Sequence, residues 1–348
     1  MYTYLKLKNI ITLRMNLLSC GGGGARGLIT IKFLVEIERI TQKPISQLFD
    51  YVSAASVGCI ITSGLLISDD GVNPKYTAKE VHDTFLKYLT GAFSWTYSSW
   101  VGSMFGLIGP SYTNTGLLKI GTELCQDKNL GCLLQPVIFP AYDRIKHKSY
   151  YFERDKDSEL LLRDVIMSCT AAPTYFESYN LEINNVKYDM LDGGLVSNAI
   201  ELVYLRATRD LQCIDKSKIL QLNIGTGSFT NTSTNKQGLI EWIPMIVNTL
   251  MNAHIENELF ELSLSLPLDN YFTLNVPLDI KYYDIDNIKQ STIDYYIQET
   301  DKWIIENTDS MYKFCSKLMT NKRFDMPNIE LTNDGYESAY ELSDEESQ

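Results

Sequence analysis

Ser56 stands in a pattern that fits a nucleophile. It lies in the pentapeptide Ala54-Ala55-Ser56-Val57-Gly58, between a run of residues that predicts a strand and one that predicts a helix. A sharp turn from strand to helix exposes a serine hydroxyl, and the start of the helix favours negative charge that develops there. The turn needs small neighbours, which Gly58 satisfies better than Ala54. The alternative is that Ser56 only caps the helix.

Residues 21–27 form a glycine-rich loop, Gly-Gly-Gly-Gly-Ala-Arg-Gly, between a predicted strand at 15–20 and a predicted helix at 28–40. Glycines let backbone N–H groups turn inward and approach an anion closely. A nucleotide is a poor fit, because no Gly-Lys-Ser/Thr follows and no G-x-G-x-x-G spacing closes with a ribose-binding acid. The remaining alternatives are an anion hole for a reaction intermediate and a flexible linker.

We expect the backbone of Gly22, Gly23 and Gly24 to form an oxyanion hole, that is, a set of N–H donors for the negative oxygen of an acyl-transfer intermediate. Arg26 would orient this loop or add positive potential beside it. The alternative for Arg26 is an ordinary solvated arginine at the start of a helix.

A nucleophilic serine needs a group that accepts its proton. The three histidines, His82, His147 and His254, lie in polar or charged contexts, and each is expected at the surface. Asp192 is the better candidate, because an apolar run leads into this acid and two glycines follow it, so that backbone can pack closely around the carboxylate. Two alternatives remain: an ordinary Asp-Gly turn, and a Ser-His-Asp hydrolase that uses His254.

Strand-like and helix-like segments alternate along the chain. Strands are predicted at residues 15–20, 49–55, 136–142, 148–152 and 219–224. Helices are predicted at residues 28–40, 57–67, 161–169, 239–264 and 291–318. This alternation predicts an α/β fold with a mainly parallel sheet, helices on both faces, and functional residues at the carboxyl ends of the strands.

Taken in order, these motifs resemble the patatin-like phospholipase family. The glycine loop is similar to the family's oxyanion-hole block, Ser56 to its nucleophile elbow, and Asp192 to the aspartate of its Ser/Asp dyad. Two supporting blocks, residues 168–176 and 222–227, also match, so the resemblance spans about residues 15–228. It implies a three-layer α/β/α fold and hydrolysis of phospholipid or other lipid acyl esters through an acyl-enzyme, without a metal or cofactor.

Three departures from the family pattern stand out. Ala54 replaces the usual first glycine of the elbow, Gly21 stands where many members have aspartate, and Asn198-Ala199 replaces the usual ending after the dyad block. An alternative follows from the first departure: a catalytically impaired member that binds lipid without cleaving it.

The charge balance and the cysteines of the chain limit the kinds of molecule that it is expected to bind. The 348 residues carry a formal net charge of -12, which argues against nucleic acid and weakens the case for strongly anionic membranes. The seven cysteines are scattered, without a CxxC pair or a metal-binding cluster, which indicates reduced thiols in the cytoplasm. We therefore expect a lipid ester substrate, phospholipid first, reached by transient contact with a membrane or micelle surface.

Three segments are predicted: an N-terminal extension at 1–14, a hydrolase domain at 15–330 and an acidic disordered tail at 331–348. Met15 is an alternative start. The uncharged, aromatic-rich stretch at 88–118 is predicted to be a lid or a wall of an acyl-chain pocket; an aromatic part of the core is the alternative.

Overall fold

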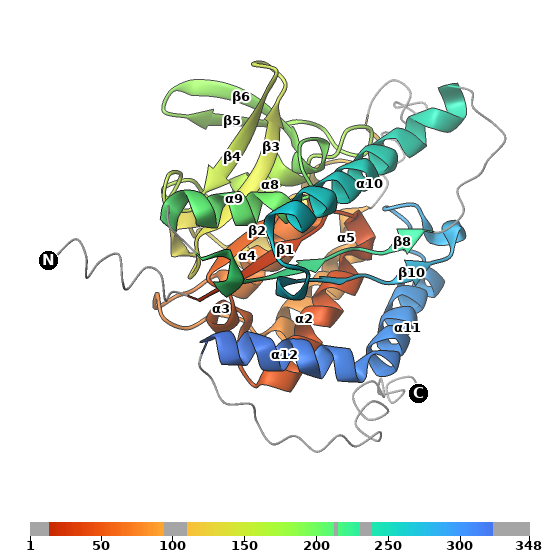
Figure 1. Cartoon of the computed structure of the whole chain (residues 1–348). Coiled ribbons are helices and arrows are strands. Elements are labelled where there is room, and N and C mark those ends of the chain that lie inside the picture. Colours follow the sequence, from red (N-terminus) through yellow and green to blue (C-terminus); the bar gives the residue numbers. More distant parts are fainter. Residues whose placement is uncertain (1–13, 94–109, 212–214, 230–238, 323–348) are drawn as a thin grey trace, which may run out of the picture.

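The structure, a computed structural model, describes residues 14–93, 110–211, 215–229 and 239–322. Figure 1 shows a central sheet with helices on both faces. The predicted three-layer α/β/α fold is therefore confirmed. The predicted tail at 331–348, nearly all of the extension at 1–14 and residues 94–109 of the aromatic-rich stretch lie outside the described residues.

The central sheet has eight strands in the order β5-β6-β3-β2-β1-β7-β9, with β4 paired to β3. Its parallel part consists of β1 (Met15–Cys20), β2 (Tyr51–Ala54), β3 (Val137–Asp143), β7 (Ile219–Ile224) and β9 (Tyr271–Leu274). Its antiparallel part adds β4 (Lys148–Glu153), β5 (Tyr179–Ile183) and β6 (Val186–Asp192). A small second sheet pairs β8 (Ser228–Phe229) with β10 (Pro277–Leu278).

Side chains of β1 alternate between two cores, as expected for a strand covered on both faces. Leu18 and Cys20 belong to the larger core, whereas Met15 and Leu17 belong to the smaller one. The smaller core is formed with α9 (Ile200–Leu211) and α10 (Leu239–Ser265). This alternation makes β1 the middle of the molecule.

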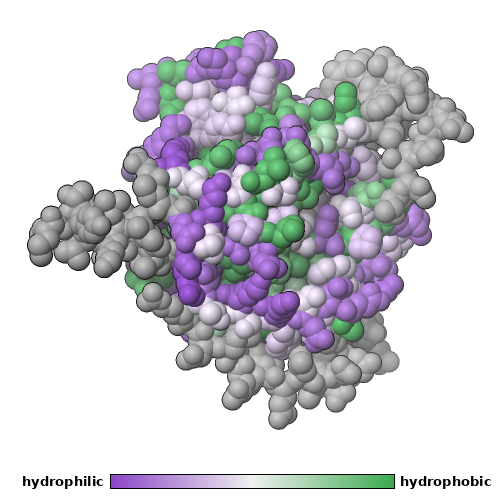
Figure 2. Space-filling model, viewed as in Figure 1, coloured by the Kyte–Doolittle hydropathy of each residue, from purple (hydrophilic) through white to green (hydrophobic). Residues whose placement is uncertain are grey.

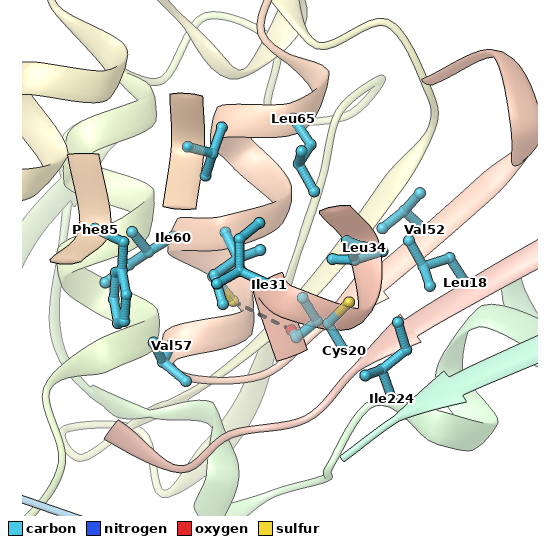
Figure 3. Close-up of a cluster of buried hydrophobic side chains, with 14 of the residues drawn as sticks. Leu18, Cys20, Ile31, Leu34, Val52, Val57, Ile60, Leu65, Phe85 and Ile224 are labelled. Carbon is cyan, nitrogen blue, oxygen red and sulfur yellow. Dashed lines mark hydrogen bonds between the residues drawn. The ribbon is translucent and has the colours of Figure 1, made fainter. Parts of the chain in front are cut away.

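The larger core lies under the remaining helices. These are α2 (Gly27–Thr41), α3 (Ile45–Leu48), α4 (Val57–Leu66), α5 (Ala78–Ala92), α7 (Thr115–Cys125), α8 (Leu162–Thr170), α11 (Gln290–Glu306) and α12 (Thr308–Lys322). Figure 3 shows side chains of β1, β2, α2, α4 and α5 packed together there. Each fully buried Leu or Ile contributes about 1.5–3 kcal/mol, so this core holds the ends of β1 and β2 firmly.

One predicted helix, at 291–318, is wrong as a single element. It is two helices, α11 and α12, separated at Asn307. The Asn307 side chain donates a 2.8 Å hydrogen bond to the carbonyl of Trp303, which ends α11 and lets the chain turn. The apolar pattern continues across this break because both helices pack on the same core. Ile304 is buried before the break and Met311 after it.

Among the described residues, no helix combines the length and the apolar character needed to cross a bilayer.

Candidate active site

Strands β2 and β6 run towards each other along one edge of β3. Near its start β3 pairs in parallel with β2, as Ser53 lies opposite Ile138. Near its end β3 pairs in antiparallel fashion with β6, as Ala141 lies opposite Asp192. Because β4 occupies the other edge of β3, β2 and β6 share one edge and finish close together. The turn after β2 and the end of β6 therefore face each other.

Ser56 and Asp192 meet at this point. The Ser56 hydroxyl donates a 2.6 Å hydrogen bond to Oδ2 of Asp192. The Ser56 backbone has φ 50° and ψ -125°, a conformation that costs a residue with a side chain about 1–3 kcal/mol. The side chain makes no capping hydrogen bond to α4. The alternative of a helix-capping serine is therefore wrong, and the strained turn points the hydroxyl away from the helix.

The elbow depends on Gly58 and tolerates Ala54. A Cβ at position 58 would lie 2.4 Å from the carbonyl oxygen of Cys20, so only glycine lets α4 start this close to β1. Ala54 is buried at the end of β2, and its φ is negative, in the range open to any residue. The departure at position 54 therefore strains no backbone; the residue with the unusual conformation is Ser56 itself.

Asp192 is held from three sides. Its backbone N–H donates to the Ala171 carbonyl at 3.0 Å, and its Oδ1 accepts a 2.7 Å hydrogen bond from the Gly194 N–H. Its exposed fraction is 4%. Burial raises the pKa of Asp192 to about 6, although the hydrogen bonds from Ser56 and Gly194 oppose that rise. At neutral pH the group is thus ionised, yet more basic than an ordinary aspartate.

The glycine loop packs directly against Ser56. A Cβ at position 22 would lie 2.9 Å from the Ser56 Cβ, so the close approach requires glycine. The Gly22 N–H donates to Asn198 Oδ1 at 3.1 Å, and the Gly22 carbonyl accepts from Thr226 Oγ1 at 2.7 Å. The Gly22 amide is therefore already engaged by a side chain, which differs from the donor role expected for it.

The next two amides of the loop are available. Within the described residues, the N–H groups of Gly23 and Gly24 donate to no other group. The loop is anchored beyond them, where the Ala25 N–H donates to the Ile285 carbonyl at 2.7 Å. Gly24 lines the same pocket as Ser56. Free amides beside a serine hydroxyl are the arrangement that binds an oxyanion.

Arg26 is buried, with an exposed fraction of 4%, so the alternative of a solvated arginine is wrong. Its Nε lies 3.4 Å from the Gly23 carbonyl, and its guanidinium carbon lies 5.1 Å from the centre of the Phe229 ring. Burial lowers the pKa of Arg26. The buried side chain thus contacts the loop from within the protein, and its role in orienting the loop stays a prediction.

A comparison with known protein families identifies the family of this chain. The family model for patatin-like phospholipase matches residues 18–203. The chain belongs to the patatin-like phospholipase family. Membership supports lipid acyl hydrolysis in general.

Several relatives span most of this patatin-like chain. A cGAMP-activated phospholipase from Escherichia coli is 28% identical, over 75% of this chain and 80% of the relative. Patatin-like protein 1 from Arabidopsis thaliana is 23% identical, over 90% and 83%, and patatin-like protein 2 is 26% identical, over 68% and 66%. The solved structure of VipD from Legionella pneumophila matches with a TM-score of 0.41 and 12% identity, over 89% of this chain and 67% of that one.

The histidines lie elsewhere in the patatin-like domain. The predicted surface position of His82 is wrong: its exposed fraction is 2%, and burial lowers its pKa. It falls on the stripe of α5 that also buries Ala78 and Phe85, and it contacts Asp83. His147 is exposed in the β3–β4 turn, and His254 lies half-buried on α10. Among the described residues, the Ser56 hydroxyl is hydrogen-bonded to Asp192 and to no histidine.

An apolar pocket opens beside Ser56. It runs between α4, α5 and α7, and the described residues that line it carry no charge. Its walls include the following pairs from those helices: Val57 and Ile60, Phe85 and Leu89, Leu117 and Ile120. Both ends of the predicted aromatic-rich stretch thus contribute to the pocket, whereas its residues Trp95, Tyr97, Trp100 and Phe105 lie outside the described residues. An acyl chain is the kind of group that such walls accept.

Sequence reasoning missed a second layer of side chains behind the glycine loop. Asn198, whose Oδ1 accepts from the Gly22 N–H, donates its own backbone N–H to Oε1 of Glu258 at 2.8 Å. The buried Glu258 carboxylate also accepts from the Ile200 N–H at 2.7 Å and the Ser197 hydroxyl at 2.7 Å. The position of Asn198 just after the dyad block was the only signal in the sequence; nothing local marks Glu258, which lies on α10.

Met251, also on α10, was missed as well. A Cβ at Gly194 would lie 3.5 Å from its Cγ and 3.2 Å from Asp192 Oδ1, and a Cβ at Gly22 would lie 2.8 Å from its Cε. Met251 is buried and lies between the glycine loop and the turn after Asp192. Its side chain thus packs against both backbone segments that flank the Ser56–Asp192 pair.

Proposed function

We propose that this chain is a serine lipid acyl hydrolase in which Ser56 is the nucleophile and Asp192 is the general base. The observation that carries the proposal is the 2.6 Å hydrogen bond from Ser56 Oγ to Asp192 Oδ2, beside two loop amides with no other acceptor among the described residues. A carboxylate that contacts the serine directly removes the need for a histidine.

The proposed reaction starts with acylation. Asp192 accepts the Ser56 proton as Ser56 Oγ attacks the ester carbonyl carbon. The carbonyl oxygen becomes negative and is held by the N–H groups of Gly23 and Gly24. The ester C–O bond then breaks, the leaving alcohol takes the proton from Asp192, and the acyl group stays on Ser56.

Deacylation repeats these roles with water. Asp192 accepts a proton from a water molecule, which attacks the acyl carbon, and the fatty acid leaves as the Ser56 hydroxyl is restored. Gly22 contributes indirectly in this scheme. Its amide is bound to Asn198 and its carbonyl to Thr226, which fixes the orientation of the amides that follow.

The substrate we propose is a lipid acyl ester, phospholipid first. The uncharged pocket between α4, α5 and α7 begins at Ser56 and suits the acyl chain. The polar head then lies towards solvent. We also propose that the hydrolase unit covers residues 15–330, because α11 and α12 pack into the same core as β1 and α2.

The test compares four purified proteins: wild type, Ser56→Ala, Asp192→Asn and His254→Ala. Fatty acid release is measured from phosphatidylcholine and from a water-soluble ester, and Ser56 is probed with a fluorophosphonate. We expect Ser56→Ala and Asp192→Asn to lose at least about three orders of magnitude in turnover, and His254→Ala to match wild type.

Two other results would contradict the proposed function. Full folding of the wild type with neither labelling nor hydrolysis would identify a lipid-binding protein without activity. Loss of activity in His254→Ala would instead support a Ser-His-Asp enzyme.

A further inference from the structure

Two hairpins project from the sheet on the side of the candidate active site. β3 continues past the end of β2, and Asp192, at the end of β6, lies opposite Ala141. From Asp192 the strand leads back to Val186, a distance of about 20 Å at the usual rise per residue. The β3–β4 turn and the β5–β6 turn thus lie beyond the carboxyl ends of the parallel strands. Figure 1 shows these hairpins standing clear of the helices.

The β3–β4 turn is basic. Residues 144–148 read Arg-Ile-Lys-His-Lys, all exposed and without an acid, in a chain whose formal charge is -12. Arg144 pairs with Asp189, so that cation is partly neutralised. Lys146 lies with its Nζ 3.5 Å from the centre of the Tyr188 ring, and Lys148 is exposed at the start of β4. Positive charge is therefore concentrated at one projecting tip.

The tips also expose apolar side chains. Ile145 is 57% exposed and Val186 is 41% exposed, one on each turn. In Figure 2 the projecting part carries hydrophilic residues with a few hydrophobic ones among them. An isolated exposed apolar residue has little meaning, but one next to basic residues has the composition of a segment that rests in the headgroup layer of a bilayer. Lys187 adds a further cation beside Val186, opposite Glu182 in the hairpin.

We propose that residues 144–148 at the tip of the β3–β4 hairpin, together with residues 184–187 at the tip of the β5–β6 hairpin, dock this protein on a lipid surface that carries anionic headgroups. The proposal rests on the proposed lipid hydrolase function, because such an enzyme must meet its ester at a lipid surface. The lysines bind the headgroups, Ile145 and Val186 enter the interface, and the carboxyl-terminal edge of the sheet faces the lipid. The acidic remainder of the chain is repelled, which favours this one orientation.

The experiment measures binding of the full chain in a Ser56→Ala background, so that binding is read without hydrolysis. The probes are phosphatidylcholine vesicles with and without phosphatidylserine, at about 0.15 M and about 1 M salt. The tip variant is Lys146→Glu with Lys148→Glu. The matched control is Lys216→Glu with Lys218→Glu, which makes the same charge change just before β7, at the amino ends of the parallel strands and away from the two hairpin tips.

We expect the parent protein to prefer phosphatidylserine vesicles at low salt and to lose that preference at high salt. The tip variant should bind these vesicles more than about tenfold less tightly, whereas the control should bind them within about twofold of the parent. The pair Ile145→Ser and Val186→Ser should weaken binding at both salt concentrations. Thermal unfolding of each variant, and hydrolysis of a water-soluble ester by the same variants carrying Ser56, verify that the fold is intact.

Three results would overturn the docking surface: no preference of the parent for phosphatidylserine, equal loss in the tip variant and the control, or binding to a short DNA duplex in place of vesicles. The proposed function fails separately, through lack of ester hydrolysis in the wild type, and that failure leaves the vesicle measurement readable.

Discussion

The Ser56 hydroxyl donates a 2.6 Å hydrogen bond to Oδ2 of Asp192, a residue 136 positions further along the chain. The two residues stand at the ends of β2 and β6, which approach each other along the same edge of β3. The contact therefore depends on the register of three strands, and changes to that register or to the elbow should affect activity before they affect the fold.

The pH dependence of hydrolysis should report Asp192. Burial raises its pKa to about 6, and only the ionised carboxylate can accept the Ser56 proton. The value of kcat/KM for a water-soluble ester should therefore fall as the pH drops through about 6. His254→Ala should leave this acid limb of the pH profile unchanged. If the midpoint of the limb shifts in that variant, the titrating group is His254 and not Asp192.

Stability should respond to pH in the opposite sense. Because the folded state binds the Asp192 proton more tightly than the unfolded chain does, ionisation of this buried group destabilises the fold as pH rises from about 4 to about 6. Asp192→Asn removes that cost. Its free energy of unfolding should exceed that of wild type by up to about 3 kcal/mol at pH 7, and the advantage should vanish near pH 4. Denaturant unfolding at both pH values measures the difference, and a constant gap would contradict it.

Gly58 should be essential for the elbow. A Cβ there would meet the Cys20 carbonyl oxygen at 2.4 Å, so Gly58→Ala must push α4 away from β1 and shift Ser56. We expect at least about a hundredfold loss in kcat, since small displacements of reacting groups have effects of this size. Gly91→Ala is the matched control, because a Cβ at that position in α5 meets nothing within 4 Å. Equal activity of the two variants would show that the elbow does not need this close approach.

Asn198 and Glu258 should act as positioning residues. Glu258 holds the backbone of Asn198, and Asn198 holds the Gly22 amide, so neither side chain needs to touch the substrate. Asn198→Ala should lower kcat about tenfold to a hundredfold with little change in KM, because the loop amides lose their orientation for the transition state.

Glu258→Gln keeps the shape and loses one acceptor, and should show a smaller effect of the same kind. Asn257→Ala, on the exposed side of the same helix, is the control and should match wild type. A rise in KM without a change in kcat would argue against positioning.

The pocket should determine acyl-chain length. Leu117 lines it and is 5% exposed, so Leu117→Trp should fill it and shift preference from long to short acyl esters. Leu118→Trp adds the same bulk one residue further along α7, where the native side chain is 39% exposed and does not line the pocket. The ratio of kcat/KM for long and short esters distinguishes the two variants. An unchanged ratio in both would place the acyl chain elsewhere.

Local pattern was sufficient for much of this fold. The strand at 15–20, the glycine loop, the helix after it and the Ser56 elbow were predicted with bounds close to those of β1, α2, β2 and α4. They follow one another in the chain, and each has a clear period or a glycine signal. The antiparallel β5–β6 hairpin was not predicted; no residue of β5 is fully buried, and β6 begins with two exposed residues, so neither strand has the buried apolar run that marks β1 and β7.

The sequence by itself determined which residues had the chemistry: a serine between small neighbours, a run of glycines, and an acid followed by two glycines. Tertiary structure alone decided their surroundings. It buried His82 and Arg26, engaged the Gly22 amide with Asn198, and placed Glu258 and Met251 of α10 behind the site. The reason is physical: burial and hydrogen-bond partners arise from contacts between segments far apart in the chain, and no local period encodes them.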